Sequence, residues 1–331
     1  MNTIIQSVGS YIPKRRYSND ELAQLHNINT SDEWIRSHTG IGYRHIAEDS
    51  QASSDLGYEA AMEALDRAGL GPEAIGGIIV ATATPDYPGF PATACVIQER
   101  LGAKQAFAFD LSAGCSGFIY GLEVARGMLH TGRVQHILVI GAEKLTSVVD
   151  WSDRNCVLFG DAAGAVVVSA DPEHPAGTRG IICSELHADG SGADALMVAA
   201  GGSRRPMKDG YDDISQITLR MEGRRVYNFA VSVLVKTLKA LLEQSSLSID
   251  DLTYIVPHQA NSRITQAAAK RLGIPMEKFY MNIEDLANTS AASIPVALRE
   301  MEEKDLLHRG DTIAIIGFGA GLTYGGNIIK W

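Results

Sequence analysis

The chain has 331 residues, of which 45% are hydrophobic, 21% charged and 7% aromatic. This composition is typical of a soluble globular protein with room for more than one core, and it excludes disordered, collagen-like and coiled-coil chains. The net charge of −10 argues against nucleic acid or an anionic membrane as the main partner. Residues 201–280 nevertheless carry 12 basic and 8 acidic side chains, a local charge of 12 − 8 = +4. This excess predicts that one face of the protein can receive an anion.

Neither export nor a membrane span is indicated by the sequence. Residues 1–13 lack a basic segment followed by an apolar run, and no stretch reaches about 18 uninterrupted apolar residues. The cysteines are too few and too scattered for a disulfide framework or a tetrahedral zinc site. We therefore expect a cytoplasmic protein in a reducing compartment, without a metal. The cysteines are Cys95, Cys115, Cys156 and Cys183.

Hydrophobic periodicity predicts an α/β chain in which helices and short strands alternate. The apolar runs are rich in Val and Ile and do not alternate with polar residues, which is typical of strands that helices cover on both faces. A parallel or mixed sheet in each half of the chain follows. In chain order, the predicted helices cover residues 31–37, 55–68, 116–129, 225–244, 259–272 and 291–307, and the predicted strands cover residues 78–80, 137–140, 165–168, 255–256 and 313–316.

An internal repeat relates the two halves of the chain. Residues 70–80 are echoed by 247–256, at an offset of 247 − 70 = 177, and residues 129–141 by 307–317, at 307 − 129 = 178. Coincidence between Leu-rich stretches is the alternative, and two matches at nearly one offset disfavour it. The repeat predicts two similar α/β halves packed face to face. The predicted domains are residues 1–172 and 173–331, with a boundary among the Asp, Glu, His and Pro residues of 170–175.

Cys115 follows a predicted strand and small residues, at the start of a predicted helix. The helix dipole and backbone N–H groups at such a position favour an anion, so we expect a lowered thiol pKa. A lone cysteine is more often a small buried hydrophobe than a nucleophile. Catalysis by Cys115 therefore needs partners from elsewhere in the chain.

Two polar residues of the second half occupy related positions. His258 follows the strand that repeats residues 78–80, and Asn288 precedes the helix that repeats the one opened by Cys115. Taken singly, a packed histidine and an N-cap asparagine are the better interpretations. Reactive groups in α/β sheets usually lie beyond the carboxyl ends of strands. The repeat therefore predicts that these three residues meet at a shared interface.

A series of short motifs runs in order along the chain: Thr30-Ser-Asp-Glu-Trp34-Ile, Thr39-Gly-Ile, Phe90-Pro-Ala, Ala113-Gly-Cys115-Ser-Gly-Phe, Phe159-Gly-Asp-Ala-Ala-Gly164, His187-Ala-Asp-Gly-Ser191, Pro257-His-Gln-Ala-Asn261, Asn288-Thr-Ser-Ala-Ala-Ser293 and Phe318-Gly-Ala-Gly-Leu-Thr323. In these motifs the chain resembles β-ketoacyl-[acyl carrier protein] synthase III of the thiolase superfamily along essentially its whole length. The resemblance implies a duplicated five-layer αβαβα fold, in agreement with the repeat.

The resemblance also implies a two-step reaction. Cys115 would be acylated by a short acyl-CoA, acetyl-CoA by default, and His258 and Asn288 would stabilise the enolate formed when malonyl-[acyl carrier protein] loses carbon dioxide. The backbone N–H groups of Cys115 and Ala320 would form the oxyanion hole. No permanently bound cofactor is expected, and acyl-CoA enters as a substrate.

Further contacts follow from the same resemblance. Trp34, Arg154 and Asn261 are expected to bind CoA, with the adenine between the indole and the guanidinium. His38 replaces an arginine common in the family, and a neutral imidazole would hold a phosphate less firmly. A homodimer is expected, in which Phe90 reaches the primer pocket of the partner. The predicted primer-pocket residues are Phe90, Leu145 and Phe159; packing in the core is an equal alternative for each.

A basic face is expected to receive the acidic carrier protein. Arg263 and Lys270 lie 270 − 263 = 7 residues apart, two turns along one face of a helix. A solvated charged face is the simpler interpretation, and Asn228 stands where family members often have Lys. The predicted docking residues are Gln259, Ala260, Asn261, Ser262, Arg263, Lys270 and Arg271.

Other functions share some of these sequence features. A papain-like hydrolase also uses Cys, His and Asn in this order, and 258 − 115 = 143 fits its spacing, but its signature around the cysteine is absent. Condensing enzymes of polyketide or quinolone assembly share the three residues. Thiolases need a second reactive cysteine, elongating ketoacyl synthases need two histidines, and a non-catalytic binding protein would not need all three polar groups. The Gly317 turn lacks the spacing of a dinucleotide site.

Overall fold

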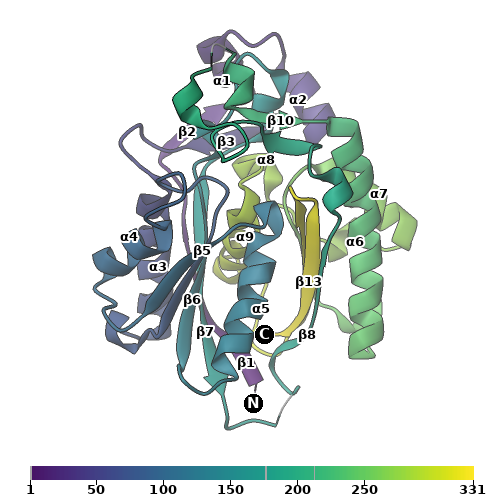
Figure 1. Cartoon of the computed structure of the whole chain (residues 1–331). Helices are drawn as coiled ribbons and strands as arrows, with labels where there is room; N and C mark the ends of the chain where they lie inside the picture. Colours follow the sequence, from purple (N-terminus) through teal and green to yellow (C-terminus); the bar gives the residue numbers. More distant parts are fainter. Residues whose placement is uncertain (1, 176, 212) are drawn as a thin grey trace.

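Two mixed sheets form the frame of the molecule, and each is built from one half of the chain (Figure 1). The structure is a computed structural model that describes residues 2–175, 177–211 and 213–331. The first sheet has the order β1 (Asn2–Tyr11), β7 (Ala162–Asp171), β6 (His136–Glu143), β4 (Gly77–Ala81) and β5 (Phe107–Leu111). The second sheet has the order β11 (Tyr254–Pro257), β12 (Thr312–Gly319), β13 (Thr323–Lys330) and β8 (Gly180–Ala188).

Both sheets combine parallel and antiparallel pairs, as predicted. In the first, β4 runs parallel to β5 and β6, and β7 runs antiparallel to β6 and β1. In the second, β11 is parallel to β12, while β13 is antiparallel to β12 and β8. The central strands are apolar because helices cover them on both faces.

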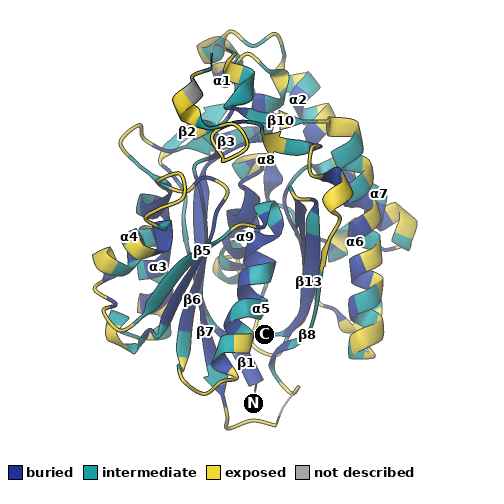
Figure 2. Cartoon of the chain, in the orientation of Figure 1, coloured by how far each residue is buried: buried dark blue, intermediate teal, exposed yellow. Residues whose placement is uncertain are grey.

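Helices complete a five-layer αβαβα arrangement, which confirms the predicted fold. Outside the first sheet lie α3 (Ser53–Ala68) and α4 (Thr93–Leu101); between the sheets lie α5 (Gly117–Leu129) and α9 (Ser293–Glu303); outside the second sheet lie α6 (Gly223–Ser245) and α7 (Ser262–Leu272). Figure 2 shows the central strands and the inner helices buried, with exposed residues on the loops and outer helices. The two halves share one core, in which Phe118 and Leu122 of α5 pack with Ile294 and Leu298 of α9.

Smaller elements form a cap at one end of the sheets (Figure 1). They are β2 (Arg15–Ser18), α1 (Asn19–His26), α2 (Asp32–Thr39), β3 (Tyr43–Ile46), β9 (Leu196–Val198), β10 (Leu219–Met221) and α8 (Ile283–Leu286). Three short 3₁₀ turns lie near this end: η2 (Gly114–Ser116), η4 (Arg154–Leu158) and η10 (Ser290–Ala292). None of the helices within the described ranges combines the length and the apolar character needed to cross a bilayer.

Two predicted helices have different bounds in the structure. The helix predicted over residues 259–272 begins at Ser262, because the side chain of Asn261 caps it by accepting the Arg263 N–H at 2.9 Å. The helix predicted over residues 291–307 begins at Ser293 and ends at Glu303. Cys115 lies in the 3₁₀ turn η2, which leads directly into α5, in agreement with its predicted place at the start of this helix.

Glycine allows the second half to approach β6 closely. A Cβ built on Gly141 would lie 2.3 Å from the carbonyl oxygen of Ala291, which is a backbone atom with little freedom to move. Gly127 of α5 differs, because it is exposed and a Cβ there would meet nothing within 4 Å. Close packing of η10 on β6 therefore requires a residue without a side chain at 141.

We expect Gly141→Ala to destabilise the protein by about 1 to 3 kcal/mol through overpacking. The matched change Gly127→Ala should stabilise it by about 0.5 to 1 kcal/mol, because alanine loses less conformational entropy in a helix. Urea unfolding of both variants measures the difference. Equal shifts in the same direction would contradict the close contact between η10 and β6.

Candidate active site

One cavity of about 670 Å³ brings together residues from both halves of the chain. Cys115 enters it from η2, His258 from the segment after β11, and Asn288 from the segment before η10. Leu145 and Phe159 contribute apolar side chains to the wall of the cavity. The meeting of the three polar residues therefore agrees with the arrangement that the repeat predicts.

The thiol of Cys115 does not have the lowered pKa that the sequence suggests. The thiol pKa is raised to about 11, mainly by burial and to a lesser extent by the nearby charge of Glu143. The backbone N–H groups of Cys115 and Ala320 and the hydroxyl of Ser290 oppose this rise. The expected helix-terminus effect was therefore wrong in its net sign, because desolvation of the thiolate outweighs the donors around it.

His258 is buried and uncharged. Its side chain is 2% exposed, and burial lowers the imidazole pKa to about 3. Nδ1 lies 2.7 Å from the hydroxyl of Ser293, and that hydroxyl also accepts the Gln259 N–H at 3.4 Å. With the Ser293 hydroxyl donating to Nδ1, the neutral imidazole carries its proton on Nε2. His258 is thus a hydrogen-bond donor rather than a base.

Asn288 is oriented by the backbone around it. Its Oδ1 accepts the Ser290 N–H at 2.9 Å, and its own N–H donates to the Leu158 carbonyl at 2.9 Å. Because the oxygen is engaged, the amide NH₂ is the part available to donate. Asn288 and His258 therefore both present donors to the cavity.

A second pair of donors surrounds the Cys115 sulfur. A Cβ on Gly319 would lie 2.7 Å from the Cys115 nitrogen and 3.0 Å from its sulfur, so only glycine fits there. This close passage places Ala320 beside η2, where the backbone N–H groups of Ala320 and Cys115 both face the sulfur. Such a pair can stabilise an oxyanion that develops next to Cys115.

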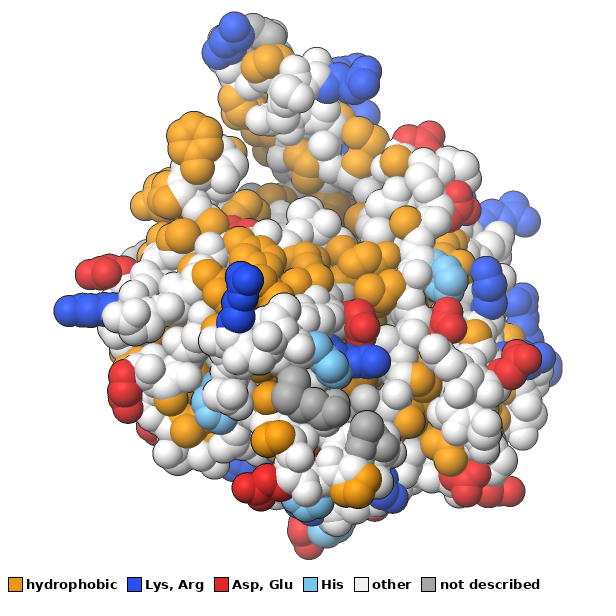
Figure 3. Space-filling model, turned by 60° about the horizontal axis from the view of Figure 1, so that its bottom comes forward, with side chains coloured by type: hydrophobic (Ala, Val, Ile, Leu, Met, Phe, Trp, Pro, Cys, Tyr) orange, Lys and Arg blue, Asp and Glu red, His pale blue; other side chains and the backbone are white. Residues whose placement is uncertain are grey.

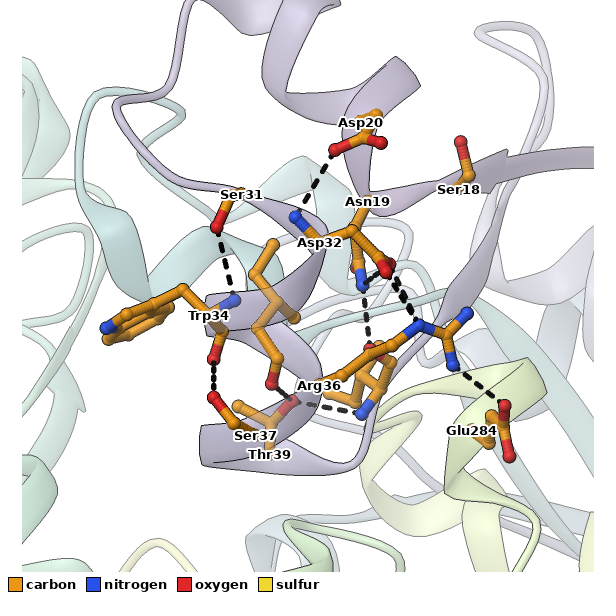
Figure 4. A network of polar contacts seen from close by, with 12 residues as sticks. Ser18, Asn19, Asp20, Ser31, Asp32, Trp34, Arg36, Ser37, Thr39 and Glu284 are labelled. Atoms are coloured by element: carbon orange, nitrogen blue, oxygen red, sulfur yellow. Dashed lines mark hydrogen bonds and ion pairs between the residues drawn. The ribbon is translucent and has the colours of Figure 1, made fainter.

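Trp34 projects from α2, which a polar network holds in place (Figure 4). The Ser31 hydroxyl accepts the Trp34 N–H at 3.2 Å, and Asp32 binds Arg36 Nε at 2.9 Å. Arg36 Nη1 then donates to Glu284 of α8 at 2.8 Å, which ties α2 to the second half. Figure 4 shows the indole of Trp34 pointing away from these residues.

The indole already has two neighbours at the cavity wall. The Arg154 guanidinium lies 4.8 Å from a ring centroid of Trp34, and the His38 imidazole stacks on the indole at 4.4 Å with an interplanar angle of 16°. All three residues line the cavity. Asn261 lines it as well, and its Nδ2 donates to the His38 carbonyl at 3.1 Å. A flat ring placed between Trp34 and Arg154 would require the guanidinium to move aside.

The predicted docking residues differ in their exposure to solvent. Arg263, Lys270 and Arg271 of α7 are exposed, and Ala260 and Ser262 are half-buried. Gln259 is only 1% exposed, and its amide donates to the carbonyls of Pro257 and Tyr280. The predicted docking contact of Gln259 was therefore wrong, because the residue is committed to internal hydrogen bonds.

Phe90 lies outside the cavity of its own chain. It is 88% exposed, and Tyr87 in the same loop is 50% exposed. The edge strand β5 is half-buried along its length, with Phe107 and Phe109 against the core. Seen from below the view of Figure 1, hydrophobic side chains form a band across the middle of the molecule (Figure 3).

Three polar residues of the site were missed by sequence reasoning. Ser293 orients His258, and Ser290 and Glu143 lie beside Cys115. Glu143 carried a usable signal, since it is a charged residue at the carboxyl end of an apolar strand. Within the described residues, no group of three or more His, Cys, Asp or Glu is arranged to hold a metal ion.

Comparisons with known proteins agree with the geometry. Residues 109–190 match the family model described as 3-oxoacyl-[acyl-carrier-protein (ACP)] synthase III, and residues 242–331 match the model of its C-terminal part. The chain is 47% identical to the β-ketoacyl-[acyl-carrier-protein] synthase III of Caldanaerobacter subterraneus, over 99% of the chain and 97% of the relative. The corresponding protein of Clostridium acetobutylicum is 44% identical, over 100% and 99%.

Solved structures extend the comparison. The crystal structure of 3-oxoacyl-[acyl-carrier-protein] synthase III from Aquifex aeolicus has a TM-score of 0.90 and 40% identity, and covers 100% of both chains. The priming β-ketosynthase of the R1128 polyketide pathway has a TM-score of 0.90 and 35% identity, over 99% of this chain and 96% of that one.

The lowered pKa of His258 predicts a dependence of stability on pH. Between pH 6.5 and pH 3 the unfolded state binds a proton at this residue and the folded state does not, so stability falls as the pH falls. Each pH unit in this window costs the wild type about 1.4 kcal/mol that a non-titrating residue would not lose. Urea unfolding of wild type and His258→Asn at pH 7, 6 and 5 measures this difference. Parallel curves for the two proteins would contradict a neutral buried imidazole.

Proposed function

This chain belongs to the 3-oxoacyl-[acyl-carrier-protein] synthase III family, and from that premise we propose that it catalyses the condensation that initiates fatty acid synthesis. A short acyl-CoA acylates Cys115 and releases CoA. Malonyl-[acyl carrier protein] then condenses with the acyl group to give 3-ketoacyl-[acyl carrier protein] and carbon dioxide. The observation that carries this proposal is the meeting of Cys115, His258 and Asn288 in one cavity.

The first step forms a thioester on Cys115. The thiolate attacks the carbonyl carbon of the acyl-CoA, and the resulting oxyanion accepts hydrogen bonds from the N–H groups of Cys115 and Ala320. Collapse of this intermediate expels CoA and leaves the acyl group on the enzyme. Ping-pong kinetics follow, because CoA leaves before the second substrate reacts.

The second step depends on His258 and Asn288. Loss of carbon dioxide from the malonyl group places negative charge on the oxygen of its thioester carbonyl. The Nε2–H of the neutral imidazole and the NH₂ of Asn288 donate to this oxygen and stabilise the enolate. The enolate carbon attacks acyl-Cys115, and the same two backbone N–H groups receive the second oxyanion.

Substrate entry uses the residues at the exposed end of the cavity. Trp34 and Arg154 bind the adenine of CoA once the guanidinium moves aside, and Asn261 supports this end by its bond to the backbone of His38. The imidazole of His38 stacks on the indole of Trp34. An arginine side chain at this position would be longer and would extend away from the indole. We propose acetyl-CoA or another short acyl-CoA as primer, held by the apolar Leu145 and Phe159.

The carrier protein docks on the exposed basic residues of α7. Arg263 lies at the rim of the cavity, and Lys270 and Arg271 lie farther along the helix. The positive charge of Arg225 is less available to the carrier protein, because its guanidinium pairs with Asp194 at 2.9 Å. Electrostatic complementarity with an acidic partner speeds association and sets its orientation.

The proposed assembly is a homodimer. The exposed Phe90 and the half-buried edge strand β5 are the features that support it, since both expose apolar surface to a partner. Phe90 would then complete the primer pocket of the other subunit. A cytoplasmic location suits the four free cysteines.

The alternative of polyketide assembly has less support. The R1128 priming ketosynthase is 35% identical to this chain, whereas the three cited synthase III proteins are 40%, 44% and 47% identical. A hydrolase would need water to attack the acyl group on the enzyme. The comparisons give no support to this alternative.

The two steps can be tested separately by intact mass and peptide mapping. With acetyl-CoA alone, an acyl increment should appear on the Cys115 peptide and disappear when malonyl-[acyl carrier protein] is added. Cys115→Ala should abolish labelling, whereas His258→Ala and Asn288→Ala should still label and should lose about 100-fold or more in condensation. Release of CoA without a persistent acyl-enzyme or a 3-ketoacyl product would sink the proposal. Parallel reactions with branched and longer acyl-CoAs identify the primer.

Reversal of charge at the cavity rim tests the docking surface. Arg263→Glu should slow condensation with malonyl-[acyl carrier protein] about 10-fold at low salt and leave acylation by acyl-CoA unchanged, because only the carrier protein needs the basic face. Arg133→Glu is the matched control, since Arg133 is also exposed but lies before β6, at the end away from the cavity. Equal loss of both steps in Arg263→Glu would show that docking is not its role.

A further inference from the structure

The two backbone N–H groups of the proposed oxyanion site belong to different halves of the chain. Cys115 lies in η2, and Ala320 lies in the loop that joins β12 to β13. Each loop rests on a glycine of the other. A Cβ on Gly114 would lie 3.0 Å from the Ala320 nitrogen, and a Cβ on Gly319 would lie 2.7 Å from the Cys115 nitrogen. This close approach brings the two donors together, but packing alone is not directional and does not fix their separation.

The hydrogen bonds between these two loops come from side chains. In the part of the chain that the structure describes, no backbone–backbone hydrogen bond joins η2 to the β12–β13 loop. The Ser116 hydroxyl donates to Thr323 Oγ1 at 2.8 Å. Thr323 Oγ1 in turn lies 2.8 Å from the carbonyl oxygens of both Ala113 and Ala320. We call this pair of hydroxyls the Ser116–Thr323 clamp.

The clamp has fewer protons than acceptors. Each hydroxyl carries one proton, and Ser116 Oγ also lies 2.8 Å from the Ala113 carbonyl oxygen. The oxygens of Ser116 and Thr323 would repel each other at 2.8 Å without a proton between them, so the Ser116 proton is committed to Thr323. The Thr323 proton is then shared by the carbonyls of Ala113 and Ala320. The bonds from Ser116 through Thr323 therefore cross between the halves whichever carbonyl takes this proton.

The need to satisfy buried carbonyls does not account for the clamp. The Ala113 carbonyl already accepts the Ser116 N–H at 3.2 Å. The repeat offers a comparison, because Gly114 and Ser290 have φ of +50° and +49° and are equivalent at an offset of 290 − 114 = 176. At this offset Ser116 corresponds to Ala292, so the equivalent turn η10 packs on β6 without a hydroxyl at this place. Of the two turns, the one with the hydroxyl is the one that carries the nucleophile.

We propose that Thr323 and Ser116 are positioning residues that set the separation of the Cys115 and Ala320 N–H groups, an inference that rests on the proposed function of these groups as the oxyanion site. Thr323 binds the backbone on both sides of the contact. Ser116 supports Thr323 from behind, where it is 0% exposed and out of reach of the substrate. Both steps of the reaction pass through an oxyanion at this place, so both depend on the clamp.

Substitutions at Thr323 test the clamp, because Thr323→Val removes the hydroxyl and keeps the shape, whereas Thr323→Ser keeps the hydroxyl. The single-turnover rate of acylation is measured by intact mass over a range of acetyl-CoA concentrations. Thr323→Val should lower the maximal rate about 10- to 100-fold and leave the half-saturating concentration within about threefold of wild type, because displaced donors stabilise the transition state less and CoA binding is unchanged. Thr323→Ser should recover the maximal rate to within about threefold of wild type.

Ser116 tests the order of the interactions within the clamp. Ser116→Ala should give a maximal rate between those of wild type and Thr323→Val. The double variant should lose no more than Thr323→Val, because Ser116 acts through Thr323 and the two effects are not additive. Additive losses in the double variant would overturn this order.

The carbonyl of the acyl-enzyme gives a readout that a purely structural role would not change. With a ¹³C-carbonyl acetyl group on Cys115, infrared difference spectra compare the folded and denatured acyl-enzymes. Thr323→Val should lose about half of the lowering in carbonyl frequency that folding produces in wild type, and Thr323→Ser should retain it. A wild-type frequency or a wild-type rate in Thr323→Val would overturn the clamp, even where urea unfolding shows the variant to be less stable.

Thr237→Val is the matched control. Thr237 of α6 is 1% exposed, and its hydroxyl has no hydrogen-bond partner within the described residues. The substitution should leave the rate and the carbonyl frequency as in wild type, within about twofold for the rate. A loss equal to that of Thr323→Val would show that any buried Thr→Val change has this effect, and the clamp would fall.

A second acyl donor separates this inference from the proposed function. p-Nitrophenyl acetate needs no CoA site, and peptide mapping identifies the cysteine that it acylates. If this ester acylates Cys115 with the predicted losses in Thr323→Val while acetyl-CoA never labels wild type, the proposed function fails and the clamp stands. If acetyl-CoA labels wild type and Thr323→Val at equal rates and with equal carbonyl frequencies, the clamp fails and the proposed function stands.

Discussion

Backbone contact between the two halves, closer than most side chains permit, is the constraint on which the active site depends. Gly319 lets β12 pass against Cys115, and Gly141 lets η10 rest on β6. These contacts set the positions of the Ala320 and Cys115 N–H groups before any substrate binds. A site whose donors are fixed by backbone packing does not have to reorganise as charge develops, and this preorganisation is the main source of electrostatic catalysis. The duplicated fold therefore matters chemically, because each half supplies the turn that completes the other.

Burial determines the protonation states in this site. It keeps the His258 imidazole neutral, so that the ring donates a hydrogen bond from Nε2, and it opposes ionisation of the Cys115 thiol. The same low polarity strengthens the interaction of each donor with an enolate or oxyanion. One environment thus assists the second step of the reaction and hinders the first.

Much of this could be read from the sequence, because the repeat and the residues at strand ends are local patterns. The repeat placed Cys115, His258 and Asn288 at a shared interface of two α/β halves, and the resemblance to the synthase III family implied their catalytic roles and the five-layer fold. The thiol pKa was predicted with the wrong sign, because the degree of burial depends on segments more than 150 residues away, such as the turn at Gly319. Gln259 was misplaced on the surface, because the helix start depends on which side chain caps it. Ser293 stood in a quoted motif, but its bond to His258 is visible only after folding.

The carbonyl stretching frequency of the acyl-enzyme tests the central claim most directly. Acylation with acetyl-CoA labelled with ¹³C at the carbonyl would place one reporter group on Cys115, and infrared difference spectra would compare the folded acyl-enzyme with the same thioester after denaturation. We expect a lower frequency in the folded state, because two fixed backbone N–H groups polarise the carbonyl more strongly than mobile water does. The same frequency in both states would contradict an oxyanion site built by the contact between the two halves.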